Sequence, residues 1–284
     1  MDKIAIVTDT DSSLPVELAA RYGIQQVPIT IHFGEETFTC GVDIDDMRVF
    51  QKIDQQHKIP TTAAPSPAAF ASAYEKAFSD GASAVVCVCV SGKISATYNA
   101  AETAREQFPG RSITVIDSFN LSMGQGFMVL AAAEAAAAGA NLQQVLAAVE
   151  ETGKRTKVYA VLATLKYLAL SGRVGKLAAG MADTLNIKPL LTVRDGKLDM
   201  LEKVRTRRKA IDRMIELVGI DLQGRNFERL AIIHVNNPSG ARELQELVAA
   251  HYRCQQPVLV AEFGAGLSVH AGAGVVGIAG VICP

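Results

Sequence analysis

In the first half of the chain, short apolar runs end in polar loops and lead into helix-prone segments. The apolar runs cover residues 4–7, 84–90 and 113–116, and the helices after them are expected to end near Tyr22, Gln107 and Ala138. Continuous apolar strands that alternate with helices predict a parallel sheet covered on both faces. Ligands bind such sheets beyond the carboxyl ends of the strands, so the polar loops are the first place to look for a site.

The second half of the chain has a different pattern. Strands are expected over residues 158–163, 229–235, 257–263 and 275–282, and helices over 206–218 and 240–251. An Asp195-Gly196 pair inside an apolar stretch predicts a β-hairpin. We therefore expect an α/β protein of two domains, with an N-terminal parallel-sheet α/β domain over residues 1–154 and a C-terminal α+β domain over residues 155–284.

Composition narrows the class of protein. Hydrophobic residues make up 49% of the 284 residues, which is enough for a sizeable core, and the net charge of -1 argues against nucleic-acid binding. Five cysteines without a C-x-x-C pair predict free thiols in a reducing compartment. The alanine-rich residues 127–140 are too few to span a bilayer. We expect a soluble, cytoplasmic protein, and the spacing of His and Cys predicts no metal site.

The stretch VSGKISATYNAA, residues 90–101, raises the question of a site around Ser95. It lacks the G-x-S-x-G pattern of a nucleophile elbow and the glycine patterns of nucleotide-binding loops. Ser95 is expected to cap a helix, and Thr62 lies just before another helix, which Ser66 caps and Pro67 begins. Hydroxyl groups at helix N-termini favour a carboxylate or a phosphate. From spacing alone, a purely local role for both residues is the simpler interpretation.

Two further residues and one basic segment are candidates for binding. Arg173 follows Gly172 and could hold a carboxylate or simply end a helix. His270 is expected in a glycine-rich loop between two strands, where it could face a ligand or bond to the backbone. Residues 203–209, KVRTRRK, could meet an acidic partner surface or lipid headgroups, or form a solvated helix face.

Six separated motifs, spread in order over almost the whole chain, carry a family resemblance. They are IVTDTDSSLP at residues 6–15, TAAPS at 62–66, ISATY at 94–98, LALSGRV at 168–174, the KPLL, Gly196 and KVRT series within 188–206, and HAGAG at 270–274. Together these motifs resemble the DegV family of bacterial fatty-acid-binding proteins. The resemblance implies a two-domain α/β fold with a long-chain fatty acid bound between the domains.

The resemblance also implies roles for individual residues. Thr62 and Ser95 would bind the fatty-acid carboxylate, with Arg173 and His270 near the head group and an apolar tunnel for the acyl chain. No cofactor is implied. The protein would not itself be an enzyme but would present its ligand to the catalytic subunit of a fatty acid kinase, which makes acyl phosphate for phospholipid synthesis.

The same resemblance makes the basic segment, with Arg205, Arg207 and Arg208, a candidate docking face for the kinase, and transient contact with a membrane surface is compatible with it. Three rival interpretations stay open. They are an acyl hydrolase or transferase that uses Ser95 as its nucleophile, a regulatory module, and a carrier for another carboxylate ligand.

Overall fold

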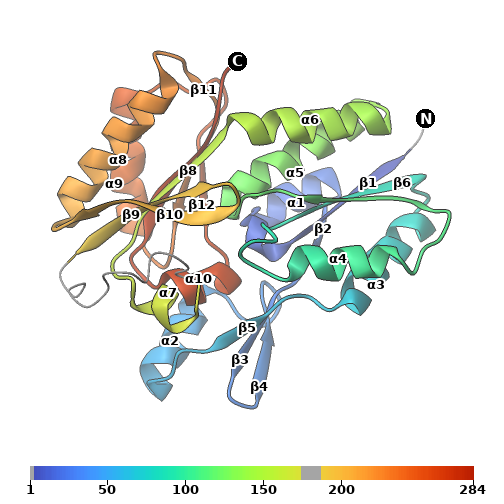
Figure 1. Ribbon diagram of the computed structural model, residues 1–284, viewed down its shortest axis with the longest axis horizontal. Coiled ribbons are helices and arrows are strands. Elements are labelled where there is room, and N and C mark those ends of the chain that lie inside the picture. The colour runs from blue at the N-terminus through green and yellow to red at the C-terminus, as the bar shows by residue number, and fades with distance from the viewer. Residues whose placement is uncertain (1–2, 174–186) are drawn as a thin grey trace.

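In the described part of the chain, the first of three β-sheets is the parallel sheet that the sequence pattern predicts (Figure 1). The computed structural model describes residues 3–173 and 187–284. The sheet has the strand order β2-β1-β6-β7, with all neighbours parallel. Its strands are β1 (Ile4–Asp9), β2 (Gln25–Val27), β6 (Ala84–Cys89) and β7 (Ser112–Asp117).

The second sheet is mixed and has the strand order β10-β9-β8-β13-β11-β12. Only β11 and β12 run parallel, and the other neighbours are antiparallel. Positive φ angles at Asp195 and Gly196 confirm the predicted hairpin turn between β9 and β10. Its strands are β8 (Thr156–Val161), β9 (Lys188–Arg194), β10 (Lys197–Val204), β11 (Phe227–His234), β12 (Leu259–Glu262) and β13 (Val276–Ile282).

A small antiparallel sheet in the N-terminal half was not predicted from the apolar pattern. It has the order β4-β3-β5 and consists of β3 (Thr30–Phe33), β4 (Glu36–Thr39) and β5 (Thr61–Ala63). Helix α2 (Asp46–Gln56) separates β4 from β5 and lies beside the C-terminal half (Figure 1). Strands of three or four residues carry too short a pattern to be recognised in sequence. Thr62, which the sequence places just before a helix, belongs to strand β5.

Helices cover the sheets in layers. Alternate residues of β1 and β6 pack on α3 and α4 on one face and on α5 on the other, as the predicted doubly covered sheet requires. Helices α8 and α9 cover the outer face of the mixed sheet. The helices are η1 (a 3₁₀ turn, Thr10–Ser12), α1 (Val16–Tyr22), α3 (Pro67–Ser79), α4 (Thr97–Arg105), α5 (Ser122–Ala137), α6 (Leu142–Arg155), α7 (Lys166–Leu170), α8 (Arg207–Leu222), α9 (Pro238–His251) and α10 (Ala265–Ala271).

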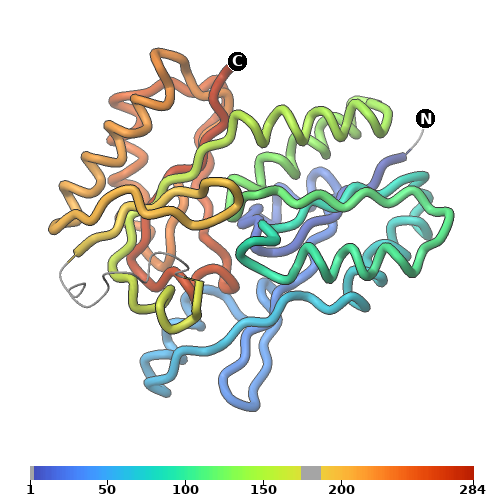
Figure 2. Tube along the Cα trace, viewed as in Figure 1, coloured from blue at the N-terminus to red at the C-terminus, as the bar shows by residue number. Residues whose placement is uncertain are grey.

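Helix α5 lies between the parallel sheet and the mixed sheet. Every residue from Ser122 to Ala133 is buried, and the helix contacts β1 and β6 on one side and β8, β11 and β13 on the other. A helix that is apolar all round can be stable only when its surroundings bury it on all sides. Figure 2 follows the chain from the parallel sheet through α5 and α6 into the mixed sheet. In the residues described, no helix has both the length and the apolar character needed to cross a lipid bilayer.

The junction between the two halves follows α6. This helix ends at Arg155, and β8 begins at Thr156. The boundary expected after residue 154 falls at this junction, and its position as a domain boundary stays a prediction. The hydrophobic core runs across the junction, because side chains of β1, α5, β8 and β13 belong to one buried cluster.

Gly124 allows α5 to approach the mixed sheet closely. A Cβ atom at this position would lie 2.6 Å from Val158 Cγ2 and 2.6 Å from Asn120 Oδ1. We expect Gly124→Ala to lower the free energy of unfolding by about 1–3 kcal/mol, as overpacking of a core does. Urea denaturation measures this loss. Gly153→Ala on α6 is the control, since its methyl group would meet only the flexible end of Met128. An equal loss in both variants would contradict the close-packing explanation.

Candidate ligand-binding site

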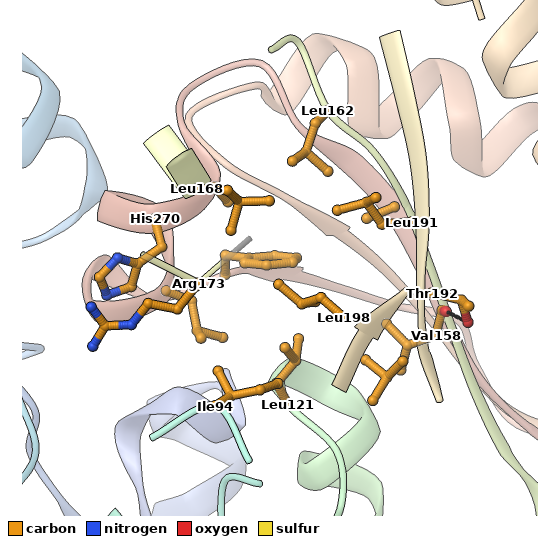
Figure 3. A pocket seen from close by; sticks show the side chains of 15 residues that line it. Ile94, Leu121, Val158, Leu162, Leu168, Arg173, Leu191, Thr192, Leu198 and His270 are labelled. Atoms are coloured by element: carbon orange, nitrogen blue, oxygen red, sulfur yellow. Dashed lines mark hydrogen bonds between the residues drawn. The ribbon is translucent and has the colours of Figure 1, made fainter. Parts of the chain in front are cut away.

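An apolar cavity lies between the two halves of the molecule (Figure 3). It encloses about 570 Å³, its opening to solvent included. Two residues of its wall, Ile94 and Leu121, come from the N-terminal half. The other described lining residues belong to β8, β9, β10, α7 and α10 or to the segments beside them. They are Val158, Ala160, Leu162, Leu168, Arg173, Leu191, Thr192, Val193, Leu198, Phe263, Leu267, His270 and Ala271. Such a wall suits a long apolar ligand with a polar group at one end.

Among the described residues that line the cavity, three are polar. The hydroxyl of Thr192 donates a 2.7 Å hydrogen bond to the carbonyl of Val158, so this side chain is satisfied within the wall. Arg173 and His270 lie side by side at the opposite end of the cavity (Figure 3). The polar end of a ligand would therefore be held at Arg173 and His270.

A hydrogen bond brings Thr62 to the same place. His270 Nε2 lies 2.7 Å from Thr62 Oγ1, although 208 residues separate them in sequence. Pairing between β3 and β5 positions Thr62 opposite Ile31, and α10 carries His270. The structure thus gathers three of the four residues expected around a carboxylate.

His270 is electrically neutral at physiological pH. Burial, and after it the positive charge of Arg173, lower its pKa to about 4. Its Nδ1 is buried and has no hydrogen-bond partner among the described residues. The imidazole can offer or accept a hydrogen bond, while the positive charge at this end of the cavity belongs to Arg173.

The surroundings of His270 differ from the sequence prediction. Instead of a loop between strands, His270 stands in α10, a helix of seven residues. Gly264 and Gly272, with φ angles of 76° and 81°, flank the helix. A helix of two turns between glycines has too little periodicity to be distinguished from a loop in sequence.

Ser95 was expected at the N-cap of α4, but it lies one residue before that position. The N-cap of α4 is Ala96, which has no side chain to cap the helix. Ser95 Oγ accepts a 3.3 Å hydrogen bond from the Thr97 backbone N–H and lies 2.8 Å from Thr97 Oγ1. Its neighbour Ile94 lines the cavity. Among the described residues, the side-chain hydrogen bonds of Ser95 stay within its own turn and do not reach Thr62 or His270.

Asp11 is a further charged residue near this site that the sequence analysis did not single out. It is 7% exposed, and its Oδ1 lies against Gly266 of α10. Burial and the negative charge of Asp9 raise the pKa of Asp11 well above its usual value, and the positive charge of Arg173 opposes this rise. The only signal in the sequence is its place in the polar loop after the first strand.

The geometry disfavours a hydrolase with Ser95 as the nucleophile. The histidine at this site contacts Thr62 instead of Ser95. No described residue hydrogen-bonds to His270 Nδ1, whereas a catalytic histidine base is normally oriented by a third group. A pKa of about 4 also makes His270 a weak base near neutral pH.

The basic segment lies away from the cavity, at the start of α8. Arg207 makes an ion pair with Glu243 of α9 at 3.1 Å, and its buried Nη2 packs against Gly240. Arg205 and Arg208 are exposed. Arg207 therefore serves to hold α8 against α9, and the exposed part of the segment is formed by its neighbours. Val174, at the end of the LALSGRV motif, lies outside the described residues.

Comparison with known proteins gives a consistent picture. The model of the DegV family, described as a family of uncharacterised proteins, matches residues 3–282. A DegV domain-containing protein of Mycobacterium tuberculosis is 36% identical over 276 residues, which cover 97% of this chain and 96% of that protein.

Solved structures extend the similarity to the fold. A DegV family protein from Thermus thermophilus, described in terms of fatty acid binding, has 33% identity and a TM-score of 0.92, over 99% of this chain and 100% of that one. DegV from Bacillus subtilis, a fatty acid binding protein, has 28% identity and a TM-score of 0.90 over 100% of both chains. The predicted two-domain α/β fold is confirmed.

The neutral state of His270 can be measured by NMR titration of its imidazole. We expect a pKa near 4 in the wild-type protein. Arg173→Gln should raise this pKa, because the substitution removes a positive charge that disfavours the imidazolium ion. Lys166→Gln, on an exposed residue of α7, is the control and should leave it unchanged. A pKa near 6.5 in the wild type would contradict the buried, neutral histidine.

Proposed function

Since this chain belongs to the DegV family, we propose that it binds a long-chain fatty acid. Thr62 and Ser95 bind the carboxylate, with Arg173 and His270 beside it, and the acyl chain fills the apolar cavity. The observation that carries the proposal is the joining of a cavity with an apolar wall to this polar cluster at one end. The relatives from Thermus thermophilus and Bacillus subtilis, which have the same fold, support the choice of ligand.

The acyl chain supplies most of the binding free energy. Each methylene group moved from water into an apolar wall contributes about 0.8 kcal/mol. A tail of about fifteen carbons contributes on the order of 12 kcal/mol before the entropy of association is subtracted. The satisfied hydroxyl of Thr192 does not oppose this burial, because its hydrogen bond to Val158 is complete without the ligand.

The head group needs hydrogen bonds to offset its loss of water. Burying a carboxylate costs several kcal/mol, and each hydrogen bond to a charged group returns about 1.5–3 kcal/mol. When Thr97 donates its hydroxyl hydrogen to Ser95, the hydroxyl of Ser95 can donate to the ligand. When His270 donates from Nε2 to Thr62, the hydroxyl of Thr62 is available in the same way. Arg173 supplies the positive charge.

The proposed role is to present the bound fatty acid and not to transform it. A separate catalytic subunit of a fatty acid kinase phosphorylates the carboxylate, and the acyl phosphate enters phospholipid synthesis in the cytoplasm. No cofactor is needed for this role. Exposed Arg205 and Arg208 form the kinase-docking face, while Arg207 supports it through Glu243. Transient contact with a membrane surface supplies or releases the ligand.

Replacing the hydroxyl of Thr62 tests the carboxylate site. We expect Thr62→Val and Ser95→Ala each to weaken binding of oleate about tenfold, because each removes one charge-assisted hydrogen bond. Displacement of a fluorescent fatty acid measures the affinity. Thr192→Val is a matched control in the same cavity, and oleate should bind it nearly as well as the wild type. Wild-type affinity in both Thr62→Val and Ser95→Ala would refute this carboxylate site.

Charge reversal on α8 tests the docking face. In the presence of ATP and a purified bacterial fatty acid kinase catalytic subunit, Arg205→Glu with Arg208→Glu should slow acyl-phosphate formation about tenfold, because like charges hinder association. Oleate affinity should be unchanged. The control is Arg242→Glu with Arg253→Glu, which changes net charge equally on exposed residues outside the basic segment. Equal slowing by both pairs would contradict the docking face, because the rate would then depend on the net charge of the protein and not on the position of the arginines.

A further inference from the structure

A second hollow lies on the surface where the two halves meet near β12. Its wall comes from η1 and the start of α1, from the turn between β4 and α2, and from β12 with the start of α10. It shares no lining residue with the apolar cavity, as far as the described residues extend. We call it the β12 groove. Three features of the groove bear on what it could bind: exposed valines, acidic side chains and the backbone of β12.

Exposed valines from three separate elements line the β12 groove. Val16 is 66% exposed, Val42 is 78% exposed and Val260 is 44% exposed. Met47, which is 57% exposed, stands beside Asp46 at the start of α2. Single exposed apolar side chains are common on protein surfaces, but several gathered around one hollow mark a surface that another molecule covers.

The charged residues of the β12 groove are all acidic. Asp45, Asp46 and Glu262 line it, and no described lysine or arginine does. Asp46 is 1% exposed; its Oδ2 accepts a 2.8 Å hydrogen bond from Ser268, while Oδ1 has no partner among the described residues. Burial raises the pKa of Asp46 to about 7; the hydrogen bond from Ser268 opposes this rise, and the negative charges of Glu262 and Asp45 add to it. A cation brought to the groove would relieve the repulsion between these carboxylates.

The backbone of β12 offers a third means of recognition. In the described sheet β12 is a terminal strand, with β11 as its one neighbour. The Phe263 N–H donates to the His234 carbonyl of β11 at 2.9 Å. Since alternate residues of a strand direct their backbone groups to opposite sides, the N–H groups of Val260 and Glu262 point away from β11. An edge of this kind can pair with an added strand.

We propose that the β12 groove binds an extended segment of a partner protein, which carries lysine or arginine next to small apolar side chains and pairs with β12 as an additional strand. Main-chain hydrogen bonds to β12 hold the segment, its apolar side chains cover Val16, Val42 and Val260, and its cation lies against Asp46 and Glu262. This partner is separate from the proposed docking face on α8, because the charge required is opposite. The proposal does not depend on the ligand of the apolar cavity.

A pair of short peptides tests the proposal on the full-length protein. The probe is an acetylated, amidated Lys-Val-Lys-Val-Lys peptide, and its counterpart has glutamate in place of lysine. In an amide NMR titration we expect the basic peptide to bind about tenfold more tightly than the acidic one, which corresponds to about 1.4 kcal/mol. Its shifts should lie at Val42, Asp46, Val260 and Glu262. Added salt should weaken the binding.

Two variants separate the charge from the strand pairing. Glu262→Gln removes a carboxylate from an exposed position and should weaken the basic peptide about threefold. Val260→Pro removes an outward N–H without interrupting the ladder to β11, and it should weaken the same peptide about fivefold. Glu246→Gln, on an exposed residue of α9, is the control for net charge and should leave the affinity unchanged.

Three outcomes would overturn the proposal. Equal binding of the basic and acidic peptides would exclude charge recognition, and equal weakening by Glu246→Gln and Glu262→Gln would exclude a local site. Binding of n-butylammonium as tight as that of the peptide would identify a site for small amines and not for a protein segment. Thermal unfolding of each variant verifies that lost binding is not lost folding.

Discussion

The burial of α5 between two sheets is the constraint on which the rest of the structure depends. Because this helix is mostly apolar and every residue from Ser122 to Ala133 is buried, it is stable only when both halves of the chain enclose it. Its burial fixes the distance between the parallel and mixed sheets, and Gly124 makes the approach to Val158 close. Leu121, directly before the helix, forms part of the cavity wall. The cavity is thus a consequence of how the two halves pack on one helix.

The polar end of the cavity separates the roles of charge and hydrogen bonding. The histidine stays neutral, because burial disfavours its imidazolium ion and the positive charge of Arg173 disfavours it further. In the proposed binding mode, Arg173 attracts the carboxylate from solvent, and Thr62 and Ser95 supply directional hydroxyl donors. Asp11 adds a buried acid near the arginine, and its raised pKa reflects the same shortage of water. In the proposed complex, the carboxylate of the ligand exchanges its hydrogen bonds to water for hydrogen bonds to these protein donors.

The short helix α10 connects two surfaces. Ser268 donates to Asp46 at the β12 groove, and His270, two residues later, contacts Thr62 at the cavity. Both contacts join the two halves of the chain, because Asp46 and Thr62 belong to the N-terminal half and α10 belongs to the C-terminal half. The position of α10 is consequently held by hydrogen bonds to α2 and β5 as well as by its own buried apolar residues, which are Ala265, Leu267, Val269 and Ala271.

The sequence by itself determined the parallel sheet, the hairpin at Asp195 and the helix that Ser66 caps and Pro67 begins, because each rests on a local signal: apolar runs, turn residues or a cap. The motifs determined the family, since their order extends over nearly the whole chain. Only the tertiary structure decided that Thr62 lies on a strand, that Ala96 instead of Ser95 occupies the N-cap position of α4, and that His270 stands in a helix. It also decided that Arg207 is tied to Glu243. The contacts of Thr62, His270 and Arg207 join residues far apart in the chain, so their energies depend on packing that no local pattern encodes.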